Sequence, residues 1–261
     1  MHVFQTQKEL QIELNKTENQ SKKIGFVPTM GALHQGHLSL LEQSLAENEI
    51  TVLSIFVNPT QFNNADDLKK YPRTLEKDVE LVLQLHKNIL IYAPSVTDIY
   101  EGNTISTSFD YDGLENQMEG KHRPGHFDGV GTIVKKLFEI VKPTNAYFGE
   151  KDFQQLQIFR ETSGLAMSSR NERLSESARN ESKLIYQILS QAKEKFVTKS
   201  ANEVVSFVEK EFKKHTNFTL EYFEIAAEDT LLTCKRKVKN KNYRGFIAVF
   251  IENIRLIDNI S

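Results

Sequence analysis

The chain has 261 residues and a formal net charge of -2, from 33 Lys plus Arg against 35 Asp plus Glu. Nucleic-acid-binding proteins usually carry a basic excess, so this balance does not indicate a nucleic-acid partner. Because Cys234 is the one cysteine, no internal disulfide can form, which is typical of a reducing compartment. The longest apolar-dominated run, residues 50–57, is too short to span a bilayer. We therefore expect a cytoplasmic protein with no membrane partner.

Strand-like and helix-like segments alternate along the first part of the chain. Leu38, Leu41 and Leu45 recur at helical spacing, whereas residues 50–57 are almost continuously apolar, as in a strand covered on both faces. In chain order, the patterns predict strands over 24–27, 50–57, 88–94 and 145–149, and helices over 37–48, 74–88, 127–141 and 151–158. This alternation predicts the α/β class, with a parallel sheet and helices on both of its faces.

The C-terminal part follows a different pattern, with no alternation that would extend the parallel sheet. The patterns predict helices over about 175–196 and 201–214, then strands over 218–227 and 245–257. Ser175 precedes the first of these helices and is expected to be its N-cap. We therefore expect two domains, a larger one over residues 1–162 and a smaller C-terminal α+β domain over 163–261.

The polar loops of the first domain come at the ends of predicted strands. In open parallel sheets, ligands bind at the carboxyl ends of the strands. The segments 28–37, 58–62 and 149–155 each follow a predicted strand and carry chemically capable side chains. These three loops are therefore the candidate site.

The first of these loops lies within GFVPTMGALHQGH, residues 25–37, and carries His34 and His37. A strand that passes through a turn with Pro28 and two glycines into a helix N-terminus offers unpaired N–H groups and a positive dipole end. Two imidazoles add donors, and positive charge when they are protonated. The pattern predicts a phosphate site, although single histidines are more often structural. With no Cys or acidic cluster of zinc spacing, we expect no protein-built metal site.

The second and third loops carry amides and charges. Asn58 and Gln61 offer paired donors and acceptors to a small polar substrate, or they simply cap a turn. Lys151 can place a positive charge on phosphate, and Asp152 can hold a ribose hydroxyl or Mg²⁺ through water. The alternative reading is a charged first turn of a helix, with Gln155 one turn further on the same face.

Two further segments carry candidate anion-binding side chains. Ser168, Ser169 and Arg170 suit phosphate oxygens, although the same residues also suit a loop that caps the following helix. The stretch KHRPGHFDGVGT, residues 121–132, is rich in Gly, Pro and basic groups, which indicates a functional or a flexible loop. Arg123 is our candidate there for contact with a substrate carboxylate or phosphate.

Taken together, these motifs resemble the pantothenate synthetase (pantoate–β-alanine ligase) family, which belongs to the nucleotidyltransferase superfamily. The matching stretches appear in the family's order within residues 24–171: GFVPTMGALHQGHLSL, SIFVNPTQF, MEGKHRPGHFDGVGTIV, YFGEKDFQQLQ and GLAMSSRN. The first stretch is long and specific, whereas a short His-x-Gly-His would indicate the superfamily alone. The resemblance implies a Rossmann-like first domain.

The resemblance also implies a reaction, an ATP-dependent ligation in pantothenate biosynthesis with Mg²⁺ present. Pantoate carboxylate attacks the α-phosphorus of ATP and releases pyrophosphate, after which β-alanine displaces AMP from pantoyl adenylate. By the same resemblance we expect a homodimer whose ligands are ATP, pantoate and β-alanine.

Site residues carried over from the family fall into three groups. His37 is the proton donor by resemblance, and we expect it to act with His34, Lys151 and Arg170 as the catalytic set. Gln61 and Gln155 fall on positions that hold pantoate, and we add Asn58 and Arg123 to the substrate-binding set. The expected ATP-binding residues are Pro28, Thr29, Met30, Gly31, Ala32, Leu33, His34, Gln35, Gly36, His37, Gly149, Glu150, Lys151, Asp152, Met167, Ser168, Ser169 and Arg170.

The chain departs from the family at one place, which keeps alternatives open. In the family, the motif ending KDFQQLQI continues through the rest of a helix and a further strand, whereas here Ile158 is followed directly by FRETSGLAMSSRN. A true deletion would favour a catalytically silent nucleotide-binding module. Another nucleotidyltransferase that acts on a phosphate ester is the nearest enzymatic alternative. A tRNA-binding role for the short basic stretch 235–244 is disfavoured by the balanced charge.

Overall fold

The computed structural model describes residues 3–111, 113–149 and 160–261. The chain divides into two compact units, the first made of Met1–Glu115 and Arg123–Gly149, the second of Asn116–His122 and Glu150–Ser261. The short segment Asn116–His122 therefore belongs to the second unit, although the sequence on both sides of it belongs to the first, which the sequence patterns did not indicate. The boundary expected between residues 162 and 163 stays a prediction.

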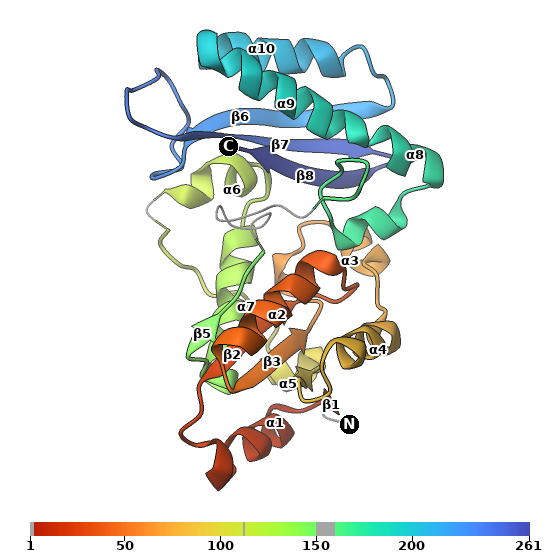
Figure 1. Cartoon of the computed structure of the whole chain (residues 1–261), viewed down its shortest axis with the longest axis vertical. Coiled ribbons are helices and arrows are strands. Elements are labelled where there is room, and N and C mark those ends of the chain that lie inside the picture. Colours follow the sequence, from red (N-terminus) through yellow and green to blue (C-terminus); the bar gives the residue numbers. More distant parts are fainter. Residues whose placement is uncertain (1–2, 112, 150–159) are drawn as a thin grey trace. The chain divides into compact units, whose positions relative to one another are not determined.

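The first unit is built on the predicted parallel sheet (Figure 1). Within the described residues its strand order is β1-β4-β3-β2-β5, and every neighbouring pair is parallel. The strands are β1 (Val3–Phe4), β2 (Ile24–Thr29), β3 (Ile50–Ile55), β4 (Leu90–Tyr92) and β5 (Asn145–Ala146). The prediction of a parallel sheet over the first part of the chain is confirmed.

Helices cover both faces of this sheet because successive strand residues point to opposite sides. Phe26 and Val52 lie in the core beneath α1, α5 and α7, whereas the next residues, Val27 and Leu53, lie in the core beneath α2 and α4. The helices of this unit are α1 (Gln7–Leu14), α2 (Gln35–Glu47), α3 (Ala65–Lys70), α4 (Leu75–Leu85), α5 (Val96–Tyr100) and α7 (His126–Val141), with 3-10 turns η1 (Thr17–Asn19), η2 (Pro59–Gln61) and η3 (Leu114–Asn116).

Two predicted boundaries near the histidines were wrong. Strand β2 continues through Pro28, which the pattern placed in the turn, and helix α2 begins at Gln35 rather than at His37. Pro28 is tolerated in the strand because β5 pairs only with Gly25 and Phe26, so the missing N–H faces no described strand. The strand therefore ends two residues closer to the histidines than expected.

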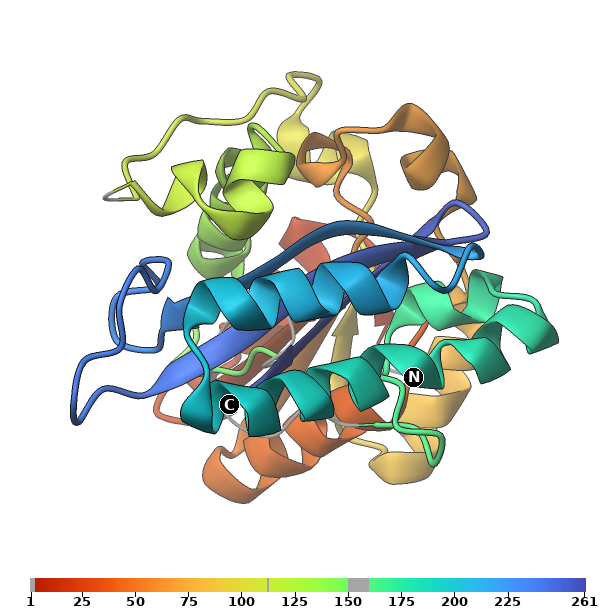
Figure 2. The same cartoon turned by 90° about the horizontal axis from the view of Figure 1, so that it is seen from above.

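The second unit contains an antiparallel sheet under a pair of helices. Its described strands follow the order β6-β7-β8, and α9 and α10 lie side by side along one face of that sheet (Figure 2). One core joins these elements, with Leu189, Val204, Val208, Ile247 and Val249 among its buried side chains. The elements are α6 (Met118–His122), η4 (Ser169–Arg173), α8 (Glu176–Glu181), α9 (Lys183–Thr198), α10 (Ala201–Phe212), β6 (Phe218–Ala227), β7 (Tyr243–Ile251) and β8 (Ile254–Ile260).

Two predictions for this unit need correction. The strand expected over 245–257 is a hairpin, because Glu252 and Asn253 adopt left-handed φ values of 50° and 61° and turn the chain between β7 and β8. The helix expected over 175–196 is interrupted at Ser182, between α8 and α9. The predicted N-cap is confirmed, since the Ser175 side chain accepts from the Ala178 N–H. In the described part of the chain, no helix has the length and hydropathy of a membrane span.

Candidate active site

The loop between β2 and α2 is held from beneath by a buried carboxylate. Gly31 and Ala32 have left-handed φ values of 84° and 50°, a conformation that needs support when it includes a residue with a side chain. Asp78, on α4 and 2% exposed, accepts from the N–H of Ala32 at 2.9 Å through one oxygen and of Leu33 at 2.8 Å through the other. Thr74 Oγ1 donates to the same carboxylate at 3.2 Å. The loop that leads to the histidines is therefore prebuilt.

Asp78 is not among the residues expected from the sequence, although a signal for it exists. Leu75, Val79 and Val82 form the apolar stripe of α4, and position 78 falls on the same stripe by helical spacing. A charged residue at such a position is expected to be exposed or to have a buried partner. A search for acidic residues on otherwise apolar helix faces would have identified it.

The two histidines cap the start of α2. His34 is the N-cap residue, and its Nδ1 accepts from the Gly36 N–H at 3.2 Å. His37 Nδ1 accepts from the His34 N–H at 3.3 Å, and the two rings lie 4.0 Å apart between centroids. Because each Nδ1 is an acceptor, each neutral ring carries its proton on Nε2. The pair therefore presents two imidazole N–H donors from a fixed position.

The loop before α2 is built differently from the backbone anion site that we expected. Five backbone N–H groups of the loop already donate to protein acceptors, those of Gly31, Ala32, Leu33, His34 and Gly36. These backbone groups therefore do not supply the phosphate contacts that we predicted. The side-chain caps satisfy donors that a helix start otherwise leaves unpaired. What the arrangement offers an anion is the Nε2–H of each ring, at the positive end of the α2 dipole.

Gln61 lies next to the histidine loop, as the sheet argument predicted. Its Nε2 contacts Met30 Sδ at 2.9 Å, and its Oε1 accepts from Asn58 Nδ2 at 3.1 Å. Asn58 itself is fully buried, with Nδ2 also donating to Gly129 O at 3.1 Å and Oδ1 accepting from Tyr100 at 2.6 Å. A substrate contact of the Asn58 side chain would require these bonds to break, and its substrate-binding role stays a prediction.

Tyr100 is a second residue of this region that is not among those expected from the sequence. Its hydroxyl lies 3.0 Å from Thr60 Oγ1 as well as donating to Asn58. Burial raises the pKa of the Tyr100 hydroxyl, which therefore keeps its proton and remains a donor to Asn58. No local pattern marks this residue, because its partner lies 42 positions away in the sequence.

Arg123 and His126 lie against the same turn. Arg123 Nη2 donates to the backbone carbonyl of Gln61 at 3.1 Å, and His126 Nδ1 lies 2.8 Å from the same oxygen. From the sequence we expected Arg123 to contact a substrate, whereas no role was expected for His126. The structure instead places both side chains on the backbone of a proposed substrate-binding residue.

The second unit holds the loop with Ser168, Ser169 and Arg170. Ser168 is the N-cap of η4, and its Oγ accepts from the Arg170 N–H at 3.3 Å. Asn171, 2% exposed, donates to Glu161 Oε1 at 2.9 Å and to Ala166 O at 3.0 Å. The capping role that we kept as an alternative is therefore present, and a phosphate role for these residues stays a prediction.

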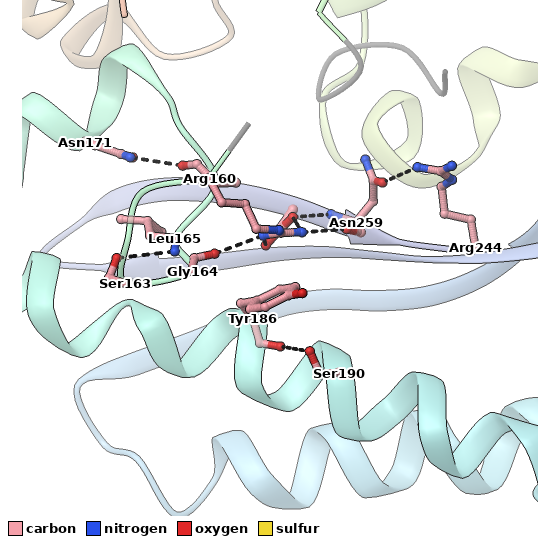
Figure 3. A network of polar contacts seen from close by, with 11 residues as sticks. Arg160, Ser163, Gly164, Leu165, Asn171, Tyr186, Ser190, Arg244 and Asn259 are labelled. Atoms are coloured by element: carbon pink, nitrogen blue, oxygen red, sulfur yellow. Dashed lines mark hydrogen bonds and ion pairs between the residues drawn. The ribbon is translucent and has the colours of Figure 1, made fainter. Parts of the chain in front are cut away.

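An ion pair between the partly buried Arg160 and the buried Asp258 anchors the chain just before this loop (Figure 3). Arg160 donates to both carboxylate oxygens of Asp258, at 2.6 and 3.0 Å, and to Gly164 O at 3.1 Å. Its guanidinium lies 3.9 Å from the centroid of the Tyr186 ring. Bidentate pairing and stacking give Arg160 one fixed geometry, which fixes the turn that leads into residues 167–171.

Four expected site residues, Glu150, Lys151, Asp152 and Gln155, lie outside the described residues, and their roles stay predictions. Gly149 is the last described residue before them. Within the described ranges, no cluster of three or more His, Cys, Asp and Glu side chains could hold a metal ion. Mg²⁺ in phosphate-transfer sites is usually held by substrate phosphates and one or two carboxylates, so we derive no step through a protein-held metal.

Comparison with known proteins identifies relatives over the whole chain. The family model described as pantoate-beta-alanine ligase matches residues 2–161 and 156–261. The pantothenate synthetase of Flavobacterium psychrophilum is 62% identical, with 100% of this chain and 99% of the relative covered, and that of Christiangramia forsetii is 48% identical over the same shares.

Solved structures give the same result. The pantothenate synthetase of Thermus thermophilus has a TM-score of 0.88 at 35% identity and covers 100% of this chain and 99% of its own. The pantoate-beta-alanine ligase of Francisella tularensis, solved with beta-gamma ATP and β-alanine, has a TM-score of 0.79 at 35% identity, with 100% and 97% covered. The two-domain α/β and α+β architecture expected from the sequence matches these structures.

The comparisons also locate a difference in length. The alignment with the Flavobacterium psychrophilum protein spans 280 positions against 261 residues here, so at least 19 of its positions have no counterpart in this chain. The family model matches in two parts that meet at residues 156–161. This is the place where the sequence analysis noted a departure from the family.

Proposed function

The chain belongs to the pantoate–β-alanine ligase family, and on that premise we propose that it condenses pantoate with β-alanine to pantothenate through pantoyl adenylate. ATP is cleaved to AMP and pyrophosphate in the course of the reaction. The observation that carries the proposal is the prebuilt pair of imidazole donors of His34 and His37 beside Gln61. This arrangement suits two anions that have to be held together, a triphosphate and a carboxylate.

The first step needs no activated nucleophile. The carboxylate oxygen of pantoate forms a bond to the α-phosphorus of ATP as the bond to the pyrophosphate oxygen breaks, so negative charge moves onto pyrophosphate. Alignment of such reactants can lower the barrier by up to about 7–11 kcal/mol. Each preorganised donor to developing charge adds roughly 2.7–4 kcal/mol. We assign the second contribution to the Nε2–H groups of His34 and His37.

The positions of the other reactants follow from the loops around Gln61. Its side chain, oriented by Asn58, is the proposed contact for pantoate. In the second step, the uncharged amine of β-alanine attacks the acyl carbon, AMP leaves with the electrons of the acyl–oxygen bond, and the nitrogen releases one proton to solvent as the amide forms. Lys151, Arg170 and the two serines before Arg170 are proposed for the phosphates, and Gln155 for pantoate, by family resemblance. Mg²⁺ would enter with the phosphates of ATP.

A second candidate function rests on the length difference. At least 19 aligned positions are missing here, near residues that the family resemblance assigns to ATP and pantoate. A chain that retains the histidine loop and the Gln61 turn but lacks part of the site would bind its ligands without completing the reaction. This candidate is a catalytically silent nucleotide-binding module.

One experiment separates the two candidates. AMP formation from ATP is measured with both pantoate and β-alanine, and with each omitted in turn, while ATP binding is measured by calorimetry. The ligase predicts AMP and pantothenate in equal amounts when both acids are present. The silent module predicts ATP binding with no AMP under any of these conditions.

The remaining assignments are a homodimer and a location in the cytoplasm. Both rest on the family resemblance and on the amino-acid composition. Light scattering of the purified protein gives the oligomeric state: a mass near twice 30.0 kDa supports the dimer, and a mass near 30.0 kDa contradicts it.

A further inference from the structure

The turn that carries Gln61 is seated directly on the start of α7. At Gly129, an added Cβ would lie 2.3 Å from Thr60 O and 2.7 Å from Gln61 Cα, closer than real Cβ contacts allow. Asn58 Nδ2 spans the same contact by donating to Gly129 O at 3.1 Å. The backbones of η2 and α7 therefore touch, and the residues just before Gly129 can reach the backbone of the turn.

Arg123 and His126 both contact the backbone carbonyl oxygen of Gln61. The carbonyl oxygen of Gln61 lies 2.8 Å from His126 Nδ1 and accepts from Arg123 Nη2 at 3.1 Å. The two side chains also contact each other, with Arg123 Nη1 3.0 Å from His126 Nε2. Arginine, histidine and carbonyl thus close a triangle of polar contacts.

This triangle determines the protonation of the imidazole. A guanidinium donates and cannot accept, so His126 Nε2 has to be the acceptor in its contact with Arg123. A carbonyl oxygen accepts and cannot donate, so His126 Nδ1 has to carry a proton. Both requirements are met by one form, the neutral ring with its proton on Nδ1. The opposite tautomer or the imidazolium would place donor against donor at Arg123.

We propose that Arg123 and His126 are positioning residues for Gln61, which act on its backbone carbonyl and do not contact a substrate themselves. With the carbonyl fixed on one side and the side-chain oxygen held by Asn58 on the other, the Gln61 amide is presented to pantoate in one orientation. The inference rests on the proposed function, in which Gln61 contacts pantoate. It reassigns Arg123 from the substrate contact that its sequence suggested.

Covalent geometry supplies a pair of variants that separates this role from a general structural one. The side-chain nitrogen of asparagine occupies the bond position of histidine Nδ1, and that of glutamine occupies the position of Nε2. His126→Asn therefore keeps the donor to the Gln61 carbonyl, whereas His126→Gln moves it to the wrong position. The matched controls are His122→Asn and His122→Gln, since His122 belongs to the same motif but stacks on Tyr222, in the second unit, at 4.7 Å.

The readouts are pantoate and ATP affinity by calorimetry and the kcat and KM for each substrate. We expect His126→Gln to weaken pantoate binding about fivefold or more, as for one lost hydrogen bond, while ATP affinity is unchanged. His126→Asn should stay close to the wild type, and Arg123→Lys, which cannot bridge both partners, should resemble His126→Gln. No difference between Asn and Gln is expected at position 122.

Nitrogen NMR of the His126 ring gives a test that does not depend on turnover. A proton on Nδ1 supports the proposal, and a proton on Nε2 or on both nitrogens overturns it. Equal pantoate affinity of His126→Asn and His126→Gln overturns it as well, as does an equal loss of ATP affinity. If the wild type binds pantoate without forming AMP, the proposed ligase function fails. The comparison of pantoate affinity between His126→Asn and His126→Gln then still tests whether His126 positions Gln61.

Discussion

Replacement of Asp78 by asparagine removes one support of the histidine loop without changing the size of the side chain. The carboxylate accepts from Ala32 and Leu33 through separate oxygens, and asparagine has one acceptor oxygen. One backbone N–H would then face an amide N–H inside the protein. Loss of a hydrogen bond to a charged group corresponds to about 1.5–3 kcal/mol, so we expect the first unit to be destabilised by roughly this amount.

The same change should affect the reaction through the position of His34. Gly31 and Ala32 both have left-handed backbone conformations, which are unfavourable for a residue with a side chain such as Ala32. The loop should therefore relax when the Asp78 carboxylate no longer accepts both of its hydrogen bonds. A shift of about 1 Å in a group that contacts reactants can cost on the order of 10²-fold in rate. We therefore expect Asp78→Asn to lower kcat by roughly tenfold to a hundredfold.

The assay combines urea unfolding, steady-state kinetics and hydrogen exchange at the Ala32 and Leu33 amides. Asp98→Asn is the matched control, because Asp98 is a carboxylate of the same unit that accepts from Gln7 N–H and Tyr92, away from the loop. Both donors to Asp98 share one oxygen, which asparagine can retain, so the control should keep kcat and lose less stability than Asp78→Asn. The reasoning is refuted if Asp78→Asn keeps its amide protection and unfolds within about 0.5 kcal/mol of the wild type, less than one such bond contributes.

Three further predictions follow from other parts of the chain. His37→Ala should lower kcat by about 10²–10³ with ATP affinity nearly unchanged, and a large loss of affinity by calorimetry would contradict its role. Arg160→Met removes the bidentate ion-pair partner of Asp258, whose side chain is 3% exposed, so urea unfolding should show a loss of about 3–5 kcal/mol, partly recovered with Asp258→Asn. Hydrogen bonds from Ser200 lower the pKa of Glu203 from 4.5 to about 2, so its contribution to stability is present above pH 4.5 and lost as pH falls toward 2. Glu203→Gln should therefore be less stable than the wild type at neutral pH and equally stable near pH 2, and a constant difference would contradict this assignment.

Local patterns were sufficient for much of the first unit. β3 follows from its continuous apolar run, and α4 from the spacing of Leu75, Val79 and Val82. Where the sequence patterns gave the wrong element, the structure depends on the backbone conformation of one or two residues. The turn at Glu252 and Asn253 interrupts an apolar run that otherwise has the composition of one strand. Nothing in the amino-acid sequence requires both residues to adopt a left-handed backbone conformation.

The candidate site shows the same limit. His34, His37 and Gln61 were identified because each follows a predicted strand, and the sheet brings those strand ends together. The residues that support them, Asp78 and Tyr100, act across separations of 45 and 42 positions. Sequence alone does not indicate such partners, because their pairing depends on which helices cover which face of the sheet.

Isotope exchange between pyrophosphate and ATP tests the central claim most directly, because it reports the adenylation step alone. If the histidine loop and the Gln61 turn hold ATP and pantoate for in-line attack, labelled pyrophosphate should enter ATP when pantoate is present and β-alanine is absent. Exchange that is absent with pantoate, or that requires β-alanine, would contradict the account.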